Sequence, residues 1–235
     1  MWWFAAIHGN LVMLIQRTRP RLFGTRKLLD AGCGTGGFLA HLSQQAPEAE
    51  TFGLDADETA CHWAAEKSAR PICVGSVNAL PFAGAAFATI VSVDVLCHQG
   101  VNEAQALGQF HRCLAAGGIL ILNLPAYRWL MSRHDAAVYN ARRYTRTELV
   151  RLLRSAGFRP IFASYWNIVL FPLMVATRKL LPAGTGSDVK LQPKFIEAVC
   201  RAATTFERGL MRAGIRFPFG GSVLAAAVKL ENAHV

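Results

Sequence analysis

The chain has 235 residues, of which 52% are hydrophobic and 17% are charged, and its formal net charge is +10. This length suits one well-buried domain, with or without a subdomain, and the composition is more apolar than usual without matching that of an integral membrane protein. The six cysteines include no C-x-x-C pair, which argues against a zinc site or a disulfide framework and indicates reduced thiols in a cytosolic protein.

The excess of basic residues leaves several kinds of partner open. Much of it lies in residues 17–27 and 128–159, where arginines alternate with apolar residues instead of forming one dense block. Nucleic acid, anionic lipid, an anionic small substrate or a solvated basic surface could each account for this pattern.

The N-terminal segment is apolar as far as Ile15 and lacks the basic start and small-residue cleavage site of a signal peptide. We expect residues 1–26 to form a helical lid on the domain. The helical spacing is carried by Trp3, Phe4, Ile7, Leu11, Leu14 and Ile15.

From Lys27 onward the pattern alternates between short apolar runs and helical segments, which is typical of a parallel sheet covered on both faces. Strands are expected at residues 27–31, 51–55, 72–75, 87–93, 119–124, 158–164 and 222–230. Helices are expected at residues 38–45, 58–68, 103–115 and 147–155. The predicted fold is therefore α/β and Rossmann-like, with a seven-stranded, mostly parallel sheet.

Residues 168–215 interrupt this alternation and are expected to form two helices, at 169–181 and 193–213. We interpret them as a helical cap inserted before the last strand, so that residues 1–235 form one domain. Residues 161–177 carry no charge but contain Asn167 and Pro172, which disfavours a membrane-spanning helix. A helix that is apolar nearly all round must be buried in the protein, in a dimer partner or in lipid. We expect the cap to roof an apolar pocket and to dock peripherally on a membrane.

Residues 30–36 read Asp-Ala-Gly-Cys-Gly-Thr-Gly, which predicts a glycine turn between the first strand and the next helix. Such a turn lets a ligand approach the backbone at a helix N-terminus. Nicotinamide and flavin enzymes share Gly-x-Gly, but here the third glycine comes too early and an acid precedes the turn. Asp30 suits a ligand with a cationic amino-acid end, which a pyrophosphate lacks. Asp55, at the end of the second strand, can accept hydrogen bonds from ribose hydroxyls.

With these motifs the chain resembles the class I methyltransferases that use S-adenosylmethionine (SAM). The resemblance extends over residues 28–39, 75–82, 87–98, 114–118 and 156–158. It also points to a bacterial subgroup with a Trp-Trp-Phe start and Pro-Ala-Tyr, His-Asp and Arg-Arg-Tyr-Thr segments, present here at residues 2–4, 125–127, 134–135 and 142–145. The resemblance implies SAM as cofactor, no metal, and a small-molecule, glycan- or lipid-linked acceptor.

The resemblance also implies which residues hold SAM. The cofactor set is Asp30, Gly32, Cys33, Gly34, Thr35, Gly36, Asp55, Ala56, Ser76, Val77, Ser92 and Val93. Asp94 is expected beside the last two, on the sulfonium side. Ser76 stands where many relatives have an acid that binds the adenine amino group, which weakens that contact. Asn140 stands where the subgroup often has a histidine.

Methyl transfer from a sulfonium needs alignment of the acceptor, and a base only when the acceptor must lose a proton. The candidate catalytic residues are His98, Tyr127 and His134, although a lone histidine such as His98 could equally cap its loop. The candidate substrate-binding residues are Asp135, Arg142, Arg143 and Tyr144. Asp135 could orient His134, and adjacent arginines suit a carboxylate or phosphate. A surface ion-pair cluster is the alternative for the arginines and tyrosine.

Three functions remain open at this stage. A methyltransferase for a small or lipid-linked acceptor is favoured. An RNA methyltransferase is supported only by the charge, since no RNA-binding module is evident and no nucleic-acid partner is expected. A noncatalytic protein with the SAM fold is the third, against which the intact turn and both acids count. A homodimer is left open.

Overall fold

The computed structural model describes residues 1–18, 27–180 and 193–230, apart from the side chains of His134 and residues 177–180. The strands are β1 (Leu28–Ala31), β2 (Thr51–Asp55), β3 (Ile72–Val74), β4 (Phe87–Val93), β5 (Leu114–Pro125), β6 (Phe158–Trp166) and β7 (Ser222–Lys229). The helices are α1 (Trp2–Thr18), α2 (Gly37–Gln45), α3 (Glu58–Ser68), α4 (Glu103–Cys113), η1 (Arg128–Leu130), α5 (Arg133–Ala137), α6 (Arg146–Ser155), α7 (Phe171–Leu180) and α8 (Lys194–Arg212).

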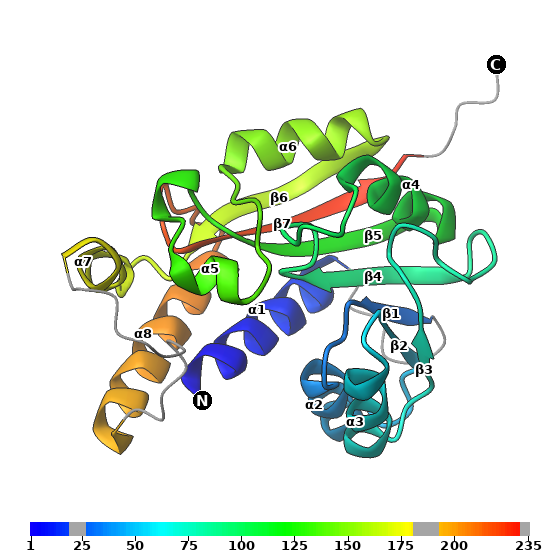
Figure 1. Ribbon diagram of the computed structural model, residues 1–235, viewed down its shortest axis with the longest axis horizontal. Coiled ribbons are helices and arrows are strands. Elements are labelled where there is room, and N and C mark those ends of the chain that lie inside the picture. Colours follow the sequence, from blue (N-terminus) through cyan, green and yellow to red (C-terminus); the bar gives the residue numbers. More distant parts are fainter. Residues whose placement is uncertain (19–26, 181–192, 231–235) are drawn as a thin grey trace.

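The seven strands form one sheet in the order β3-β2-β1-β4-β5-β7-β6. Neighbouring strands from β3 to β5 are parallel, and β7 is antiparallel to both β5 and β6. The prediction of a mostly parallel Rossmann-like sheet is therefore confirmed. Figure 1 shows α4 and α6 on one face and α1, α2 and α3 on the other, with α8 beside α1.

The sheet has its hydrophobic centre in β4 and β5, whose apolar side chains are buried on both faces. Continuous apolar runs of this kind are typical of parallel strands covered by helices. The chain continues outward from β1 to β2 on one side and from β4 to β5 on the other. The carboxyl ends of β1 and β4 therefore border a topological switch point, where open α/β sheets bind their ligands.

The N-terminal helix forms as predicted, and its second half is part of the hydrophobic core. Residues 10–15 of α1 are all buried, so this part of the helix is surrounded on every side and belongs to the main core. The helix packs on α8, and the side chain of Arg17 donates a hydrogen bond to the carbonyl oxygen of Met211 at 2.9 Å. The predicted lid residues 19–26 lie outside the described part of the chain.

The apolar segment that leads into α7 is not fully buried by the described part of the protein. Val169 is 54% exposed and Leu173 is 63% exposed. Of the three predicted environments, burial inside the protein is therefore wrong for these two residues. No helix in the described residues is both long and apolar enough to span a membrane.

Candidate functional site

A cavity of about 970 Å³ opens at the carboxyl ends of β1, β2 and β4. Its polar wall is the glycine turn after β1 together with the acids that follow the strands, and its apolar wall is the first half of α1. The cavity lies at the topological switch point of the sheet, the position where the sequence predicted a ligand site.

The three glycines of the turn have positive φ angles but different surroundings. A Cβ on Gly32 would collide with the side chain of Val95, and one on Gly36 would lie 2.7 Å from Cα of Ala64. Gly36 thus lets α2 pack against α3, and it does not line the cavity. A Cβ on Gly34, whose φ is 51°, would have no heavy atom within 4 Å. Of these three glycines, Gly34 is therefore the one at which a ligand can approach the backbone closely.

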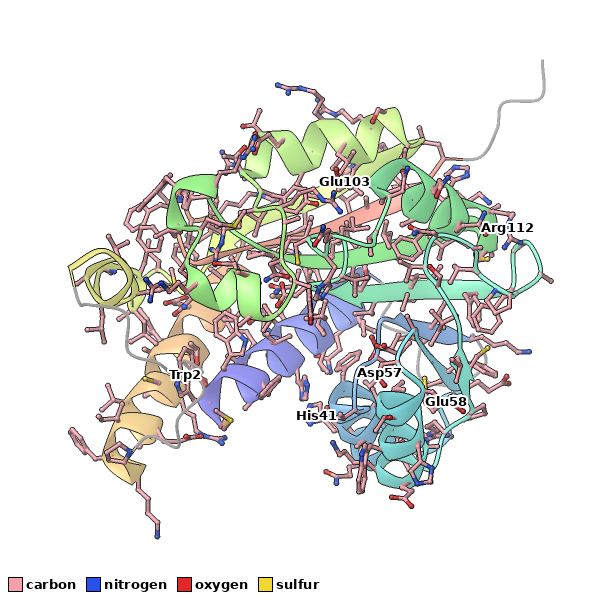
Figure 2. All side chains as sticks on the ribbon, viewed as in Figure 1. Trp2, His41, Asp57, Glu58, Glu103 and Arg112 are labelled. Carbon is pink, nitrogen blue, oxygen red and sulfur yellow. The ribbon has the colours of Figure 1, made fainter. Side chains whose placement is uncertain are left out.

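Asp55 is fixed by two backbone amides. Its Oδ2 accepts a hydrogen bond from the amide of Gly34 at 2.7 Å, and its Oδ1 accepts one from the amide of Asp57 at 3.1 Å. Asp57 in turn caps α3 by accepting hydrogen bonds from the amides of Thr59 and Ala60, and Figure 2 labels it at this end of the helix. The carboxylate of Asp55 therefore joins the glycine turn to the next βα turn at the cavity wall.

Asp30 lines the same cavity from the end of β1 and is 3% exposed. Burial, and then the negative charge of Asp55, raise the pKa of Asp30 to about 7. Such a shift means that the protein alone does not compensate the ionised carboxyl for its burial. A cation placed beside Asp30 would supply it.

A second acid, Asp94, enters the cavity from the end of β4 with a φ of 54°. Burial raises its pKa to about 7, although a hydrogen bond from Asn123 and the charge of Arg143 oppose the shift. The Nδ2 of Asn123 donates to Oδ1 of Asp94 at 3.1 Å, and its Oδ1 accepts from Nε1 of Trp166 at 2.8 Å. Trp166 stacks on Trp3 of α1 with the ring centres 4.9 Å apart. One continuous chain of contacts thus ties the orientation of Asp94 to α1.

His98 also lines the cavity, on the loop that follows β4. Arg142 holds this loop by donating hydrogen bonds to the carbonyl oxygens of Leu96, His98 and Val101. The hydroxyl oxygen of Tyr144 lies 2.9 Å from the Leu96 carbonyl and 2.7 Å from a carboxylate oxygen of Glu103. Neither Arg142 nor Tyr144 lines the cavity, and both contact the loop behind it.

Arg143 and Asp135 form a buried ion pair, with side chains 4% and 1% exposed. The Nε of Arg143 donates to Oδ1 of Asp135 at 2.9 Å, its Nη2 donates to Oδ2 at 3.0 Å, and its Nη1 donates to the Ala126 carbonyl. Burial would raise the pKa of Asp135, but the hydrogen bonds and charge of Arg143 outweigh it and lower the pKa. The Asp135 carboxylate bonds to Arg143 and Ser132, while the side chain of His134 lies outside the described part.

Two further predicted residues lie away from the cavity. Tyr127 stacks on Tyr165 with the ring centres 5.1 Å apart and contacts Trp129 and Phe171. Burial raises its pKa. The hydroxyl of Ser92 donates to the carbonyl of Ala31 at 2.8 Å and ties β4 to β1. The remaining members of the predicted cofactor set line the cavity: Asp30, Gly32, Cys33, Gly34, Thr35, Asp55, Ala56, Ser76, Val77 and Val93.

The apolar wall was not predicted residue by residue. It comes from α1, whose contributing side chains are Trp3, Phe4, Ile7 and His8. No described residue of 168–215 lines the cavity, so the prediction that this cap roofs it is wrong for the described residues. The reason is packing, because α8 covers α1 instead of the cavity.

His8 is the one titratable side chain in this apolar wall. Burial and the neighbouring His41, whose ring centre is 5.3 Å away, lower the pKa of His8 to about 4. In Figure 2, His41 on α2 points toward α1. His8 therefore adds no positive charge to the apolar wall near neutral pH.

The profile of a family described as a methyltransferase domain matches residues 29–122. A curated malonyl-[acyl-carrier protein] O-methyltransferase from Dechloromonas aromatica is 32% identical over 120 residues, which cover 50% of this chain. The match spans only 43% of that relative's length.

Two solved structures share the fold over nearly the whole chain. The first, a complex between the Haloferax volcanii Trm112 methyltransferase activator and a putative methyltransferase, has a TM-score of 0.65 and 17% identity, covering 99% of this chain and 91% of that one. The second is geranyl diphosphate methyltransferase in complex with SAM, with a TM-score of 0.64 and 16% identity, covering 96% and 85%. At these identities the likeness shows the fold.

Proposed function

We propose that the chain is a class I SAM-dependent methyltransferase that transfers the methyl group of SAM to a small-molecule or lipid-linked acceptor. The observation that carries the proposal is the cavity in which two carboxyl groups, Asp30 and Asp55, face the open backbone at Gly34. This arrangement favours a ligand with a cationic end and hydroxyl donors.

The residues of the cavity fit SAM at three points. Asp30 would hold the cationic amino-acid end, and its raised pKa is the signature of a carboxyl that lacks such a partner. Asp55 would accept hydrogen bonds from the ribose, and Ser76 and Val77 would lie against the adenine. Bound there, SAM would supply an activated methyl group: an acceptor atom in line with the sulfonium would bond to the methyl carbon as the methyl–sulfur bond breaks and the thioether leaves. The protein's part is to align the acceptor with it.

We assign the acceptor to the side of the cavity formed by Asp94, His98 and α1. Asp94, with a pKa of about 7, can accept a proton near neutral pH, which suits an acceptor that must lose one. The apolar side chains of Trp3, Phe4 and Ile7 favour an acceptor with an apolar part. The curated relative is named for a malonyl group on an acyl carrier protein, so the acceptor in its name is an acyl group and not a nucleic acid.

The affinity for SAM is expected to fall roughly tenfold between pH 7.5 and pH 6. Asp30 has a raised pKa of about 7, so acid converts the carboxylate that binds the cation into a neutral acid. His8, with a pKa of about 4, stays neutral over this range. Calorimetry across the range measures the effect, and Asp30→Asn should bind weakly with a much flatter profile. Equal affinity at both pH values would contradict the role of Asp30.

Methyl transfer is expected to fall about 100-fold or more in Asp94→Asn for an acceptor that must lose a proton, while SAM affinity changes less than about threefold. His98→Ala should lower turnover in the same assay, since His98 lines the acceptor side. The measurement is transfer of labelled methyl groups from SAM into small-molecule and lipid extracts.

Arg70→Met is a suitable control, because Arg70 bonds to Ser43 and the Pro47 carbonyl and does not line the cavity. Tyr127 and His134 remain predictions from the sequence, and alanine variants in this assay test them. Label recovered in RNA alone would overturn the proposed acceptor class. Full activity of both Asp94→Asn and His98→Ala would contradict our assignment of the acceptor to the side of the cavity formed by these two residues.

A further inference from the structure

Helix α8 presents an apolar stripe to solvent. Its buried side chains, Cys200, Thr204, Glu207 and Met211, lie on one face. The outward stripe consists of Phe195, Val199, Ala202 and Phe206, which follow one another at helical spacing. Phe195 is 78% exposed, Val199 48% and Phe206 65%. No described part of the chain covers the exposed surface of these side chains. Burial of each large apolar side chain would be favourable in free energy.

A row of cations runs along the same helix. Lys194, Arg201 and Arg212 are exposed, and their positions place them together, about a third of a turn from the apolar stripe. The acids of α8 are both engaged. Glu197 pairs with the N-terminal amine and Arg201, and buried Glu207 accepts hydrogen bonds from the amides of Asn167 and Val169. The solvent face of α8 therefore combines apolar side chains with positive charge.

Further exposed apolar side chains lie in the segment whose backbone amides bind Glu207 of α8. Val169 and Leu173 are exposed there, and an aromatic group follows in which Phe171 contacts both Trp129 and Phe219. Figure 1 shows α7 and α8 at the same end of the molecule, away from α2 and α3. Several large apolar side chains exposed at one end of a molecule are typical of a site of interaction.

The positive charge around α8 indicates which kind of partner fits its exposed face. Residues 158–230 contain ten Lys or Arg and only three Asp or Glu, so this part supplies most of the net charge of +10. A second copy of the chain docked face to face would bring the same cations together, which opposes association. An anionic bilayer complements them, and an amphipathic helix with aromatic residues on one side and cations beside them is typical of helices that lie in a membrane interface.

We propose that α8 docks this protein on the surface of an anionic lipid bilayer, with Phe195, Val199 and Phe206 entering the interface and the adjacent cations facing the headgroups. The inference does not depend on the proposed function. Because α8 packs on α1, and α1 lines the cavity, docking would bring the apolar wall of the cavity within one helix of the membrane.

Flotation with vesicles tests the proposal. The wild-type protein should float with vesicles of phosphatidylcholine containing about 30% phosphatidylglycerol and remain unbound with phosphatidylcholine alone, because the cations need anionic headgroups. Phe195→Ser/Phe206→Ser should lower partitioning about tenfold or more, and Lys194→Glu/Arg201→Glu should lower it by a similar factor. Raised salt should weaken binding of the wild-type protein.

Trp63→Ser is the matched control. Trp63 is 54% exposed on α3, far from α8 along the sheet, so this variant removes an exposed aromatic residue and should float like the wild type. Circular dichroism and thermal unfolding establish that each variant is folded. Absence of flotation with anionic vesicles would overturn the proposal, as would equal flotation of the wild type and the Phe195→Ser/Phe206→Ser variant. A concentration-dependent dimer without vesicle binding would overturn it in favour of a second copy.

Discussion

An Arg143→Met variant is expected to lose about 3–5 kcal/mol of its free energy of unfolding, which for a chain of this size is a large part of the total. The change leaves the carboxylate of Asp135 buried and without its charged partner, since both side chains are almost fully inaccessible. It also removes the hydrogen bond to the Ala126 carbonyl at the end of β5. Chemical denaturation monitored by circular dichroism measures the loss.

The control for this prediction is Arg201→Met, which breaks an exposed ion pair with Glu197 and should cost less than about 1 kcal/mol. The double variant Arg143→Met/Asp135→Leu should recover part of the loss, because no isolated buried charge remains. In the wild type the lowered pKa of Asp135 stabilises the fold above its unfolded value of about 3.9, and this contribution disappears as the pH falls below it. A loss below about 1 kcal/mol in Arg143→Met would show that the pair contributes little.

SAM affinity is expected to fall about 5- to 150-fold in Asp55→Ala and to become undetectable in Gly34→Val. Removal of Asp55 leaves the ribose hydroxyls and the Gly34 amide without their acceptor, a loss of about 1–3 kcal/mol. A Cβ at position 34 would have no heavy atom of a non-neighbouring residue within 4 Å, so the valine side chain would project into the space that we assign to the cofactor. Calorimetry with SAM and its demethylated product measures both effects.

The Gly34→Val variant would combine two effects, strain in the backbone and obstruction of the cofactor. The φ of 51° at Gly34 costs a non-glycine residue about 1–2 kcal/mol, so the two effects need a control that separates them. Gly214→Val provides the comparison. Gly214 also has a positive φ and open space around its Cβ position, but it does not line the cavity. Gly214→Val should lose at least as much stability as Gly34→Val, because its φ of 100° lies outside the left-handed region that side chains can adopt, and only Gly34→Val should lose SAM binding. Unchanged affinity in both Asp55→Ala and Gly34→Val would refute a SAM site at this turn.

Much of the fold could be predicted because the signals are local. The alternation of apolar runs and amphipathic segments identified all seven strands within a few residues, and the start of β5, at Leu114 instead of residue 119, is the largest difference. The short elements η1 and α5 were not predicted. They contain three and five residues, too few to show a helical period.

Only part of the site could be predicted, because only some of its residues are recognisable from local sequence. The glycine turn and Asp55 lie next to their strands in the sequence and have a recognisable spacing. The contacts that orient Asp94 join residues far apart, since Asn123 and Trp166 are separated by 43 positions and Trp3 comes from the first helix. Arg142 and Tyr144 resembled a binding cluster, but their partners are carbonyl groups of a loop more than 40 residues away. Such pairings depend on the packed fold and leave no periodic pattern.

The order of the strands has a consequence for how the protein is made. β6 pairs only with β7 among the described strands, and β7 also fills the open side of β5. During synthesis β5 and β6 are therefore complete long before the strand that joins them leaves the ribosome. Until then both present unpaired backbone edges, which are prone to pairing with other chains. Residues 222–229 act as the closing strand of this half of the sheet, and a ribosome that stalls before them would release a chain exposed to aggregation.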